Sequence, residues 1–167
     1  MMSFLDSADD DPKRASRRPL LFFVLVTLAV GAAASVFTEP NITTWYAGLV
    51  HPSFAPPNWL FAPVWTTLYV MMAVAAWRVW RIAGTKSVEM GAYVLQLIFN
   101  FAWSAIFFAS HQIGLALIDT GILVALILIA TILFGRRDRL AGLLFLPYLA
   151  WTSFATALNY AFWSLNP

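Results

Sequence analysis

The sequence contains no cysteine, so it can form no disulfide, no thiolate metal site and no covalent haem attachment. Charge is also scarce. Lys, Arg, Asp and Glu make up 11% of the 167 residues, whereas an ordinary globular domain carries about a quarter. The sequence shows no catalytic triad, P-loop, Rossmann glycine motif or paired carboxylates. Covalent catalysis therefore has no candidate residue.

Apolar residues are abundant instead, at 61% of the chain with a mean hydropathy of +0.76. A soluble fold could not cover that much apolar surface, so lipid must be the solvent for most of the chain. Five segments approach the roughly 20 apolar residues that a spanning helix needs. They are residues 20–37, 63–80, 88–109, 113–134 and 140–163. The sequence therefore predicts an all-α membrane protein, a bundle of five transmembrane helices over residues 20–167, with a polar tail at 1–19 and a loop at 38–62.

The ten lysines and arginines fall in three groups, at residues 13–18, 78–86 and 136–139. In a five-span chain these groups share one side of the membrane. The positive-inside rule then predicts a multi-pass integral membrane protein with a cytoplasmic N-terminus and an outer C-terminus, in an inner or an outer membrane. A second interpretation takes the first span as a cleaved signal peptide, which leaves four spans. The basic tail fits a topology determinant touching anionic lipid better than a nucleic-acid-binding arm, so no nucleic-acid partner is expected.

Few polar side chains interrupt the spans, and several share helical faces. Gln96, Asn100 and Trp103 follow the spacing i, i+4, i+7, which places them on one face. Trp151 and Asn159 share another. Buried amides often hold helices together, but mid-span tryptophans also suit the wall of an aromatic cavity, and both interpretations stay open. Asp119 fits a ligand contact, a proton-handling group or a buried hydrogen-bond acceptor.

The two histidines, His51 and His111, lie in or beside loops. An imidazole can ligate a metal or haem iron, but neither histidine has a second ligand nearby in the sequence. No metal site is predicted. Small residues at Gly31 and Ser35 allow close helix approach, either within the chain or in a homodimer.

The loop contains the stretch HPSFAPPNWLFAPVW at residues 51–65. A plain spacer would be polar and flexible, whereas this segment is stiffened by prolines and carries large apolar rings. We interpret it as a lid that folds Trp45, Phe54 and Trp59 over a cavity, and we count Trp45 and Trp59 among the predicted ligand-site residues. The alternative is a loop that lies in the headgroup layer with its aromatic rings anchored there.

Three blocks of sequence resemble the signature of the translocator protein family, also called the tryptophan-rich sensory proteins or peripheral-type benzodiazepine receptors. The blocks contain WYAGL (45–49), PPNW (56–59) and APVW (62–65), then QLIFNFAW (96–103), then PYLAW (147–151) and LNY (158–160). The resemblance implies a five-helix bundle, commonly dimeric. It also implies that the chain binds porphyrins, such as protoporphyrin IX or haem, and other flat hydrophobic molecules, without a required cofactor.

By position, the resemblance implies ligand-site residues on the last four spans. They are Phe61, Ala62, Val64, Trp65, Asn100, Trp103, Leu115, Asp119, Trp151, Phe154, Ala155 and Leu158. Trp65 and Trp151 match the tryptophans that the family uses in porphyrin photochemistry. Leu158 and Tyr160 match part of the cholesterol motif of animal members, but no basic residue follows Tyr160, so sterol binding is doubtful.

Three functions are consistent with these features. The first is a tetrapyrrole sensor, receptor or carrier. The second is an enzyme that degrades porphyrin with light and oxygen, using Trp65 and Trp151. The third is a signalling scaffold whose basic loops contact a partner according to ligand occupancy. An ion-coupled transporter is disfavoured because the sequence shows no inverted repeat.

Overall fold

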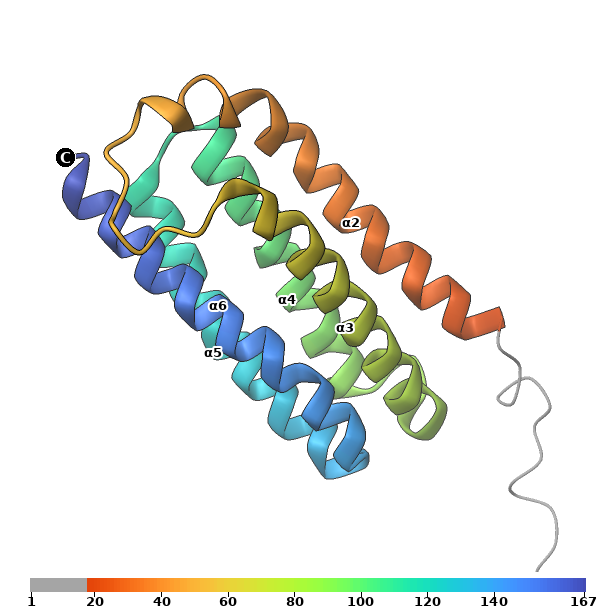
Figure 1. Ribbon diagram of the computed structural model, residues 1–167. Helices are drawn as coiled ribbons and strands as arrows, with labels where there is room; N and C mark the ends of the chain where they lie inside the picture. Colours follow the sequence, from red (N-terminus) through yellow and green to blue (C-terminus); the bar gives the residue numbers. More distant parts are fainter. Residues whose placement is uncertain (1–17) are drawn as a thin grey trace, which may run out of the picture.

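The computed structural model describes residues 18–167, which form an all-helical bundle (Figure 1). Its long helices are α2 (Arg18–Ile42), α3 (Phe61–Ala83), α4 (Val88–Ser104), α5 (Ile113–Arg137) and α6 (Arg139–Leu165). Short helical turns are η1 (Tyr46–Gly48), η2 (Asn58–Leu60) and η3 (Ala105–Ala109). Five helices are long and apolar enough to cross a membrane, and residues 18–167 contain no strand. The predicted fold class is confirmed, while the predicted tail lies outside the described residues except at 18 and 19.

Helix α2 continues to Ile42, five residues past the end predicted from hydropathy. Side chains support its polar last turns: the Thr38 hydroxyl donates to the Ala34 carbonyl at 3.3 Å, and the Asn41 amide donates to the Phe37 carbonyl at 2.9 Å. Pro40 lies within this final stretch of helix. Glu39 therefore belongs to a candidate membrane span, whereas the hydropathy pattern predicts that it lies in the loop.

Local hydrogen bonds and backbone geometry fix the helix termini that lie near the lysines and arginines. Helix α3 ends at Ala83 and is capped by Gly84, whose φ of 76° is in the left-handed region that favours glycine. Asp138 caps α6 by accepting hydrogen bonds from the N–H groups of Leu140 and Ala141. It also pairs with Arg78 at 2.7 Å. Burial alone would raise the pKa of Asp138, but the guanidinium and the two N–H groups outweigh it and hold the pKa below its ordinary value.

The described lysines and arginines gather at one end of the bundle, where α2 and α6 begin and α3 and α5 end (Figure 1). We call this the basic end. The opposite end, the loop end, carries the α2–α3 connection, the α4–α5 turn and the C-terminus of α6. This segregation is the geometry that the predicted membrane orientation requires, and the orientation itself stays a prediction.

The two halves of the bundle have separate cores. Toward the basic end the core is closely packed, and Met72, Val79, Phe134 and Phe145 are fully buried. Toward the loop end a smaller cluster contains Tyr46, Phe107, Phe108, Ile113, Ala116, Leu158 and Phe162. Many large apolar side chains face outward, including Leu21, Phe22 and Leu25 on α2. Their exposure suits a surrounding of lipid rather than water.

Helices α5 and α6 approach each other closely at a pair of glycines. A Cβ atom placed on Gly142 would lie 2.7 Å from the Cα atom of Gly135 and 3.3 Å from the Thr131 carbonyl oxygen. Neither neighbour is the end of a flexible side chain, so a larger residue would push the helices apart.

Gly142→Ala should therefore lower the stability of the protein by about 1–3 kcal/mol, the usual cost of overpacking. Gly121→Ala on α5 is the matched control, because a Cβ there meets nothing within 4 Å. It should be neutral or stabilising by up to about 1 kcal/mol, through helix propensity. Melting temperatures in one detergent compare the two variants, and equal melting temperatures would contradict the close α5–α6 contact.

Candidate functional site

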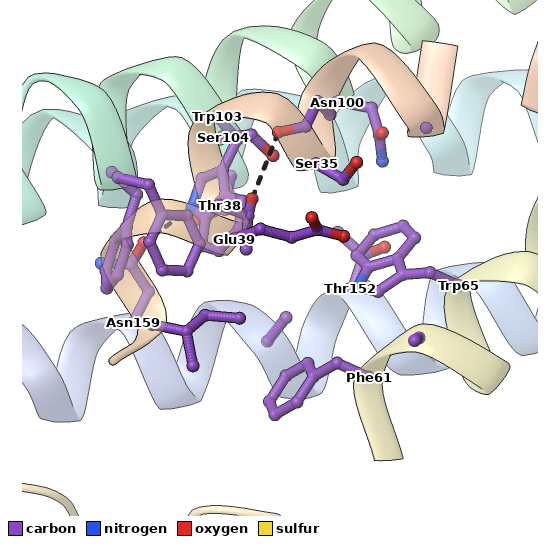
Figure 2. A pocket seen from close by; sticks show the side chains of 18 of the residues that line it. Ser35, Thr38, Glu39, Phe61, Trp65, Asn100, Trp103, Ser104, Thr152 and Asn159 are labelled. Carbon is purple, nitrogen blue, oxygen red and sulfur yellow. Dashed lines mark hydrogen bonds between the residues drawn. The ribbon is translucent and has the colours of Figure 1, made fainter. Parts of the chain in front are cut away.

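A cavity of about 570 Å³ lies between the middle of the bundle and its loop end. Side chains from all five long helices line it, as Figure 2 shows for a subset. Its volume falls in the range of about 300–1,000 Å³ that is usual for small-molecule sites. Members of both core clusters contribute to the wall, including Tyr69 and Leu123 from one and Phe107 and Leu158 from the other.

The wall is mostly apolar and rich in rings. From α2 and the loop it has Leu28, Gly31, Ala32, Ala34, Ser35, Thr38, Glu39, Ile42, Tyr46 and Asn58; from α3, Phe61, Ala62, Trp65, Thr66 and Tyr69; from α4 and η3, Asn100, Trp103, Ser104, Phe107 and Phe108; from α5, Thr120 and Leu123; from α6, Thr152, Ala155, Leu158, Asn159 and Phe162. Glu39 is the one charged side chain among these described residues.

Helices α2 and α3 border the open side of the cavity. They touch at Gly31, where a Cβ atom would lie 2.3 Å from Cε2 of Tyr69. Of the lining residues nearer the loop end, Glu39, Ala62 and Thr66 are exposed. The cavity thus opens between α2 and α3. The contact with Tyr69 also assigns Gly31 to packing within the chain, one of the two alternatives that the small residues allowed.

A hydrogen-bond network forms the floor. The Tyr69 hydroxyl donates to Oδ1 of Asn100 at 2.6 Å, and the Asn100 amide donates to the Tyr148 hydroxyl at 3.1 Å. Tyr148 donates in turn to Oε1 of Gln96 at 2.9 Å. The Gln96 amide donates to the Tyr93 carbonyl at 3.0 Å. This network joins α3, α4 and α6, so the amides hold helices together, and Asn100 lines the cavity as well.

A second amide fixes the loop-end wall. The Trp103 indole N–H donates to Oδ1 of Asn159 at 2.9 Å, and the Asn159 amide donates to the Ile113 carbonyl at 3.0 Å. Trp103 also stacks on Phe107 with ring centroids 5.1 Å apart. Phe107 lies in η3, a π-helical turn that widens the end of α4. Such turns frequently occur at functional sites, and this one contributes Phe107 and Phe108 to the wall.

The loop supports the wall more than it covers the cavity. Trp45 stacks on His111 at 4.2 Å and meets the edge of Phe107 at 5.4 Å, behind the cavity surface. Phe54 and Trp59 are 51% and 72% exposed. Phe54 and Trp59 lie outside the cavity lining, so the lid interpretation stays a prediction. Their exposure agrees with the alternative of aromatic rings in the headgroup layer.

Hydrogen bonds to the C-terminal end of the chain hold the middle of the loop. Asn166 accepts a hydrogen bond from the Val50 N–H at 2.8 Å and donates to the Val50 carbonyl at 3.1 Å. Nε2 of His51 lies 3.1 Å from the Tyr46 carbonyl oxygen, and Nε2 of His111 lies 3.2 Å from Oδ1 of Asn41.

Burial raises the pKa of the Tyr46 phenol. Within residues 18–167, no three His, Asp or Glu side chains gather as a metal site would require.

Half of the predicted ligand-site residues line the cavity. These are Phe61, Ala62, Trp65, Asn100, Trp103, Ala155 and Leu158. The others, Trp45, Trp59, Val64, Leu115, Asp119, Trp151 and Phe154, do not.

The residues outside the lining have distinct surroundings. Trp151 packs against Phe61 and Phe154, with ring centroids 5.9 and 5.6 Å away, so it stands behind the wall. Leu115 is 47% exposed. Asp119 is buried, and its Oδ2 atom has no hydrogen-bond partner among the described residues.

Among the lining residues that the sequence did not predict, the largest group from one helix lies on α2. Gly31, Ala34, Ser35 and Thr38 follow the spacing i, i+3, i+4, i+7, which places them on one helical face. That pattern is legible in the sequence, but small residues suggested helix packing before a cavity wall. Thr152 was not predicted because the sequence does not tell which of the two threonines of this helix, Thr152 or Thr156, faces a cavity.

Known proteins are similar to this sequence over most of its length. The TspO/MBR family matches residues 23–164. A tryptophan-rich protein TspO of Archaeoglobus fulgidus is 40% identical over 148 residues, which cover 88% of this chain and 96% of that protein. The human translocator protein is 38% identical over 152 residues, 89% of this chain and 90% of its own. A tryptophan-rich sensory protein of Cereibacter sphaeroides is 34% identical over 144 residues, with 86% and 90% covered.

Tyr148→Phe removes the hydroxyl that joins Asn100 to Gln96, and both amides lose a buried partner. We expect a stability loss of about 1–3 kcal/mol, because unsatisfied buried polar groups carry the full cost of desolvation. Tyr160→Phe, at an exposed position on the same helix, should leave the melting temperature unchanged. Equal stabilities of the two variants would contradict the network's role.

Proposed function

The chain belongs to the TspO/MBR family of membrane sensory and translocator proteins, and from this premise we propose that it is an integral-membrane receptor or carrier for tetrapyrroles. The observation that carries the proposal is the cavity. It offers about 570 Å³ of mostly apolar space that all five helices line and that opens between α2 and α3.

The wall chemistry suits a flat, conjugated ligand. Phe61 and Trp65 approach from α3, and Trp103 and Phe107 approach from α4 and η3. Aromatic rings pack on one another through offset stacks and edge contacts, which give affinity with few directed polar bonds. An opening between two helices also admits a ligand that is dissolved in the bilayer. Neither His51 nor His111 lines the cavity, so the chemistry favours an iron-free porphyrin such as protoporphyrin IX over haem.

One observation favours a second candidate, the light- and oxygen-dependent breakdown of bound porphyrin. Trp65 lines the cavity and is in ring contact with Tyr69 and Tyr148, at centroid distances of 5.7 and 6.1 Å. These oxidisable rings extend from the cavity wall into the core. Trp151 stands one ring further back, behind Phe61, so of these two tryptophans Trp65 is the one positioned to exchange an electron with a bound porphyrin.

Trp65→Ala should weaken binding of protoporphyrin IX by about tenfold or more, because it removes the largest ring on the α3 wall. Trp163→Ala is the control, since Trp163 is half exposed and lies outside the lining. Quenching of tryptophan fluorescence by protoporphyrin IX, titrated in the dark in lipid nanodiscs, gives both affinities.

Equal affinities for the two variants, or an absence of saturable quenching in the unmodified protein, would contradict the proposed site. The same samples, illuminated in the presence of oxygen, test the second candidate. New absorbance bands that form with the unmodified protein and are lost in Trp65→Phe would support breakdown. Unchanged porphyrin absorbance would leave binding as the function.

A further inference from the structure

Two polar groups without protein partners face the cavity from opposite helices. Glu39 extends from α2, and Figure 2 shows its carboxylate directed across the cavity toward Trp65 and Thr152. Thr152 lies on α6 and is 2% exposed, and its Oγ1 atom has no hydrogen-bond partner among the described residues. The neighbouring hydroxyls of Ser35, Thr38 and Thr66 bond instead to carbonyls of their own helices.

The position of Glu39 is costly for the protein alone. It lies in the last turn of α2, where the negative end of the helix dipole disfavours a carboxylate. It is exposed at the opening of the cavity, in the last turn of a candidate membrane span, and an ionisable side chain within a span usually serves a function. Within residues 18–167, no lysine, arginine or histidine joins it in the cavity wall. The fold therefore supplies no counter-charge for this carboxylate.

We propose that Glu39 and Thr152 select ligands that carry a hydrogen-bond-donating nitrogen, above all a cationic one, at the edge of a flat ring system. The carboxylate accepts the N–H bond, and the Thr152 hydroxyl completes the polar contact from the opposite side. The neighbouring Trp65 offers an aromatic face that attracts a cation. An acidic substituent on the ring system would be repelled by Glu39 and would lie away from it.

This inference rests on the proposed function only in taking the cavity as the ligand site. It adds a chemical preference that ring stacking does not supply. A purely apolar cavity would bind charged and uncharged ring systems of one shape according to their hydrophobicity. A cavity with a charge-assisted acceptor would favour the cationic member of such a pair, because hydrogen bonds to charged groups are the stronger ones.

The test compares two three-ring probes, 9-aminoacridine, which is cationic at neutral pH, and anthracene, which is uncharged. Tryptophan-quenching titrations use the full chain in nanodiscs of zwitterionic lipid. Glu39→Gln should weaken the binding of 9-aminoacridine by about tenfold or more and leave the affinity for anthracene unchanged. Thr152→Val should weaken the binding of 9-aminoacridine by a smaller factor. Thr156→Val, the matched control on α6, removes a hydroxyl that bonds to the Thr152 carbonyl outside the cavity wall, and it should have no effect.

Unchanged affinity of Glu39→Gln for 9-aminoacridine would overturn the inference, as would an equal loss for both probes. If the unmodified protein still bound protoporphyrin IX saturably in that case, the proposed function would stand without the polar selection. If protoporphyrin IX did not bind but 9-aminoacridine bound through Glu39, the polar selection would stand and the tetrapyrrole proposal would fail.

Discussion

Four polar side chains in the middle of the bundle bond to one another because lipid offers them no other partner. Tyr69, Asn100, Tyr148 and Gln96 connect α3, α4 and α6 through consecutive hydrogen bonds. In a bilayer each of these groups would be costly if left alone, so their mutual satisfaction fixes the relative positions of three helices. The packed core lies on one side of this network and the cavity on the other. Asn100 and Tyr69 belong to both the network and the cavity wall, so the site inherits the rigidity of the core.

The hollow half of the bundle needs other supports because it lacks a packed centre. Gly31 lets α2 contact Tyr69 at the level of the floor, and nearer the loop end the two helices border the opening. Asn166 holds the loop, while the Trp103–Asn159 bond joins α4 to α6. The π-helical turn at the end of α4 brings two phenylalanine rings into the wall. These contacts lie around the cavity rather than in it, which leaves its interior free for a ligand.

The sequence predicted the parts of this structure that depend on hydropathy and spacing. Five apolar runs gave the five helices, and the shared face of Gln96, Asn100 and Trp103 is present in α4. The sequence did not predict that α2 continues to Ile42, because Glu39 and Pro40 resemble a loop when the hydropathy has already fallen. Because this last part of α2 was not predicted, Glu39, the charged residue of the cavity wall, was not predicted to line the cavity either. Trp151 was placed in the wall by resemblance, but its position behind Phe61 depends on how α3 packs on α6, which spacing within one helix does not encode.

The central claim is that the cavity between the five helices is the ligand site, and the lack of native cysteine allows a direct test. Ala155→Cys places a single thiol in the cavity wall, while Ala157→Cys places one at an exposed position two residues further along α6. The measurement is the rate of maleimide labelling of each variant with and without saturating protoporphyrin IX. The account predicts that the porphyrin slows labelling at position 155 and leaves position 157 unaffected. Equal rates at position 155 with and without porphyrin would contradict it.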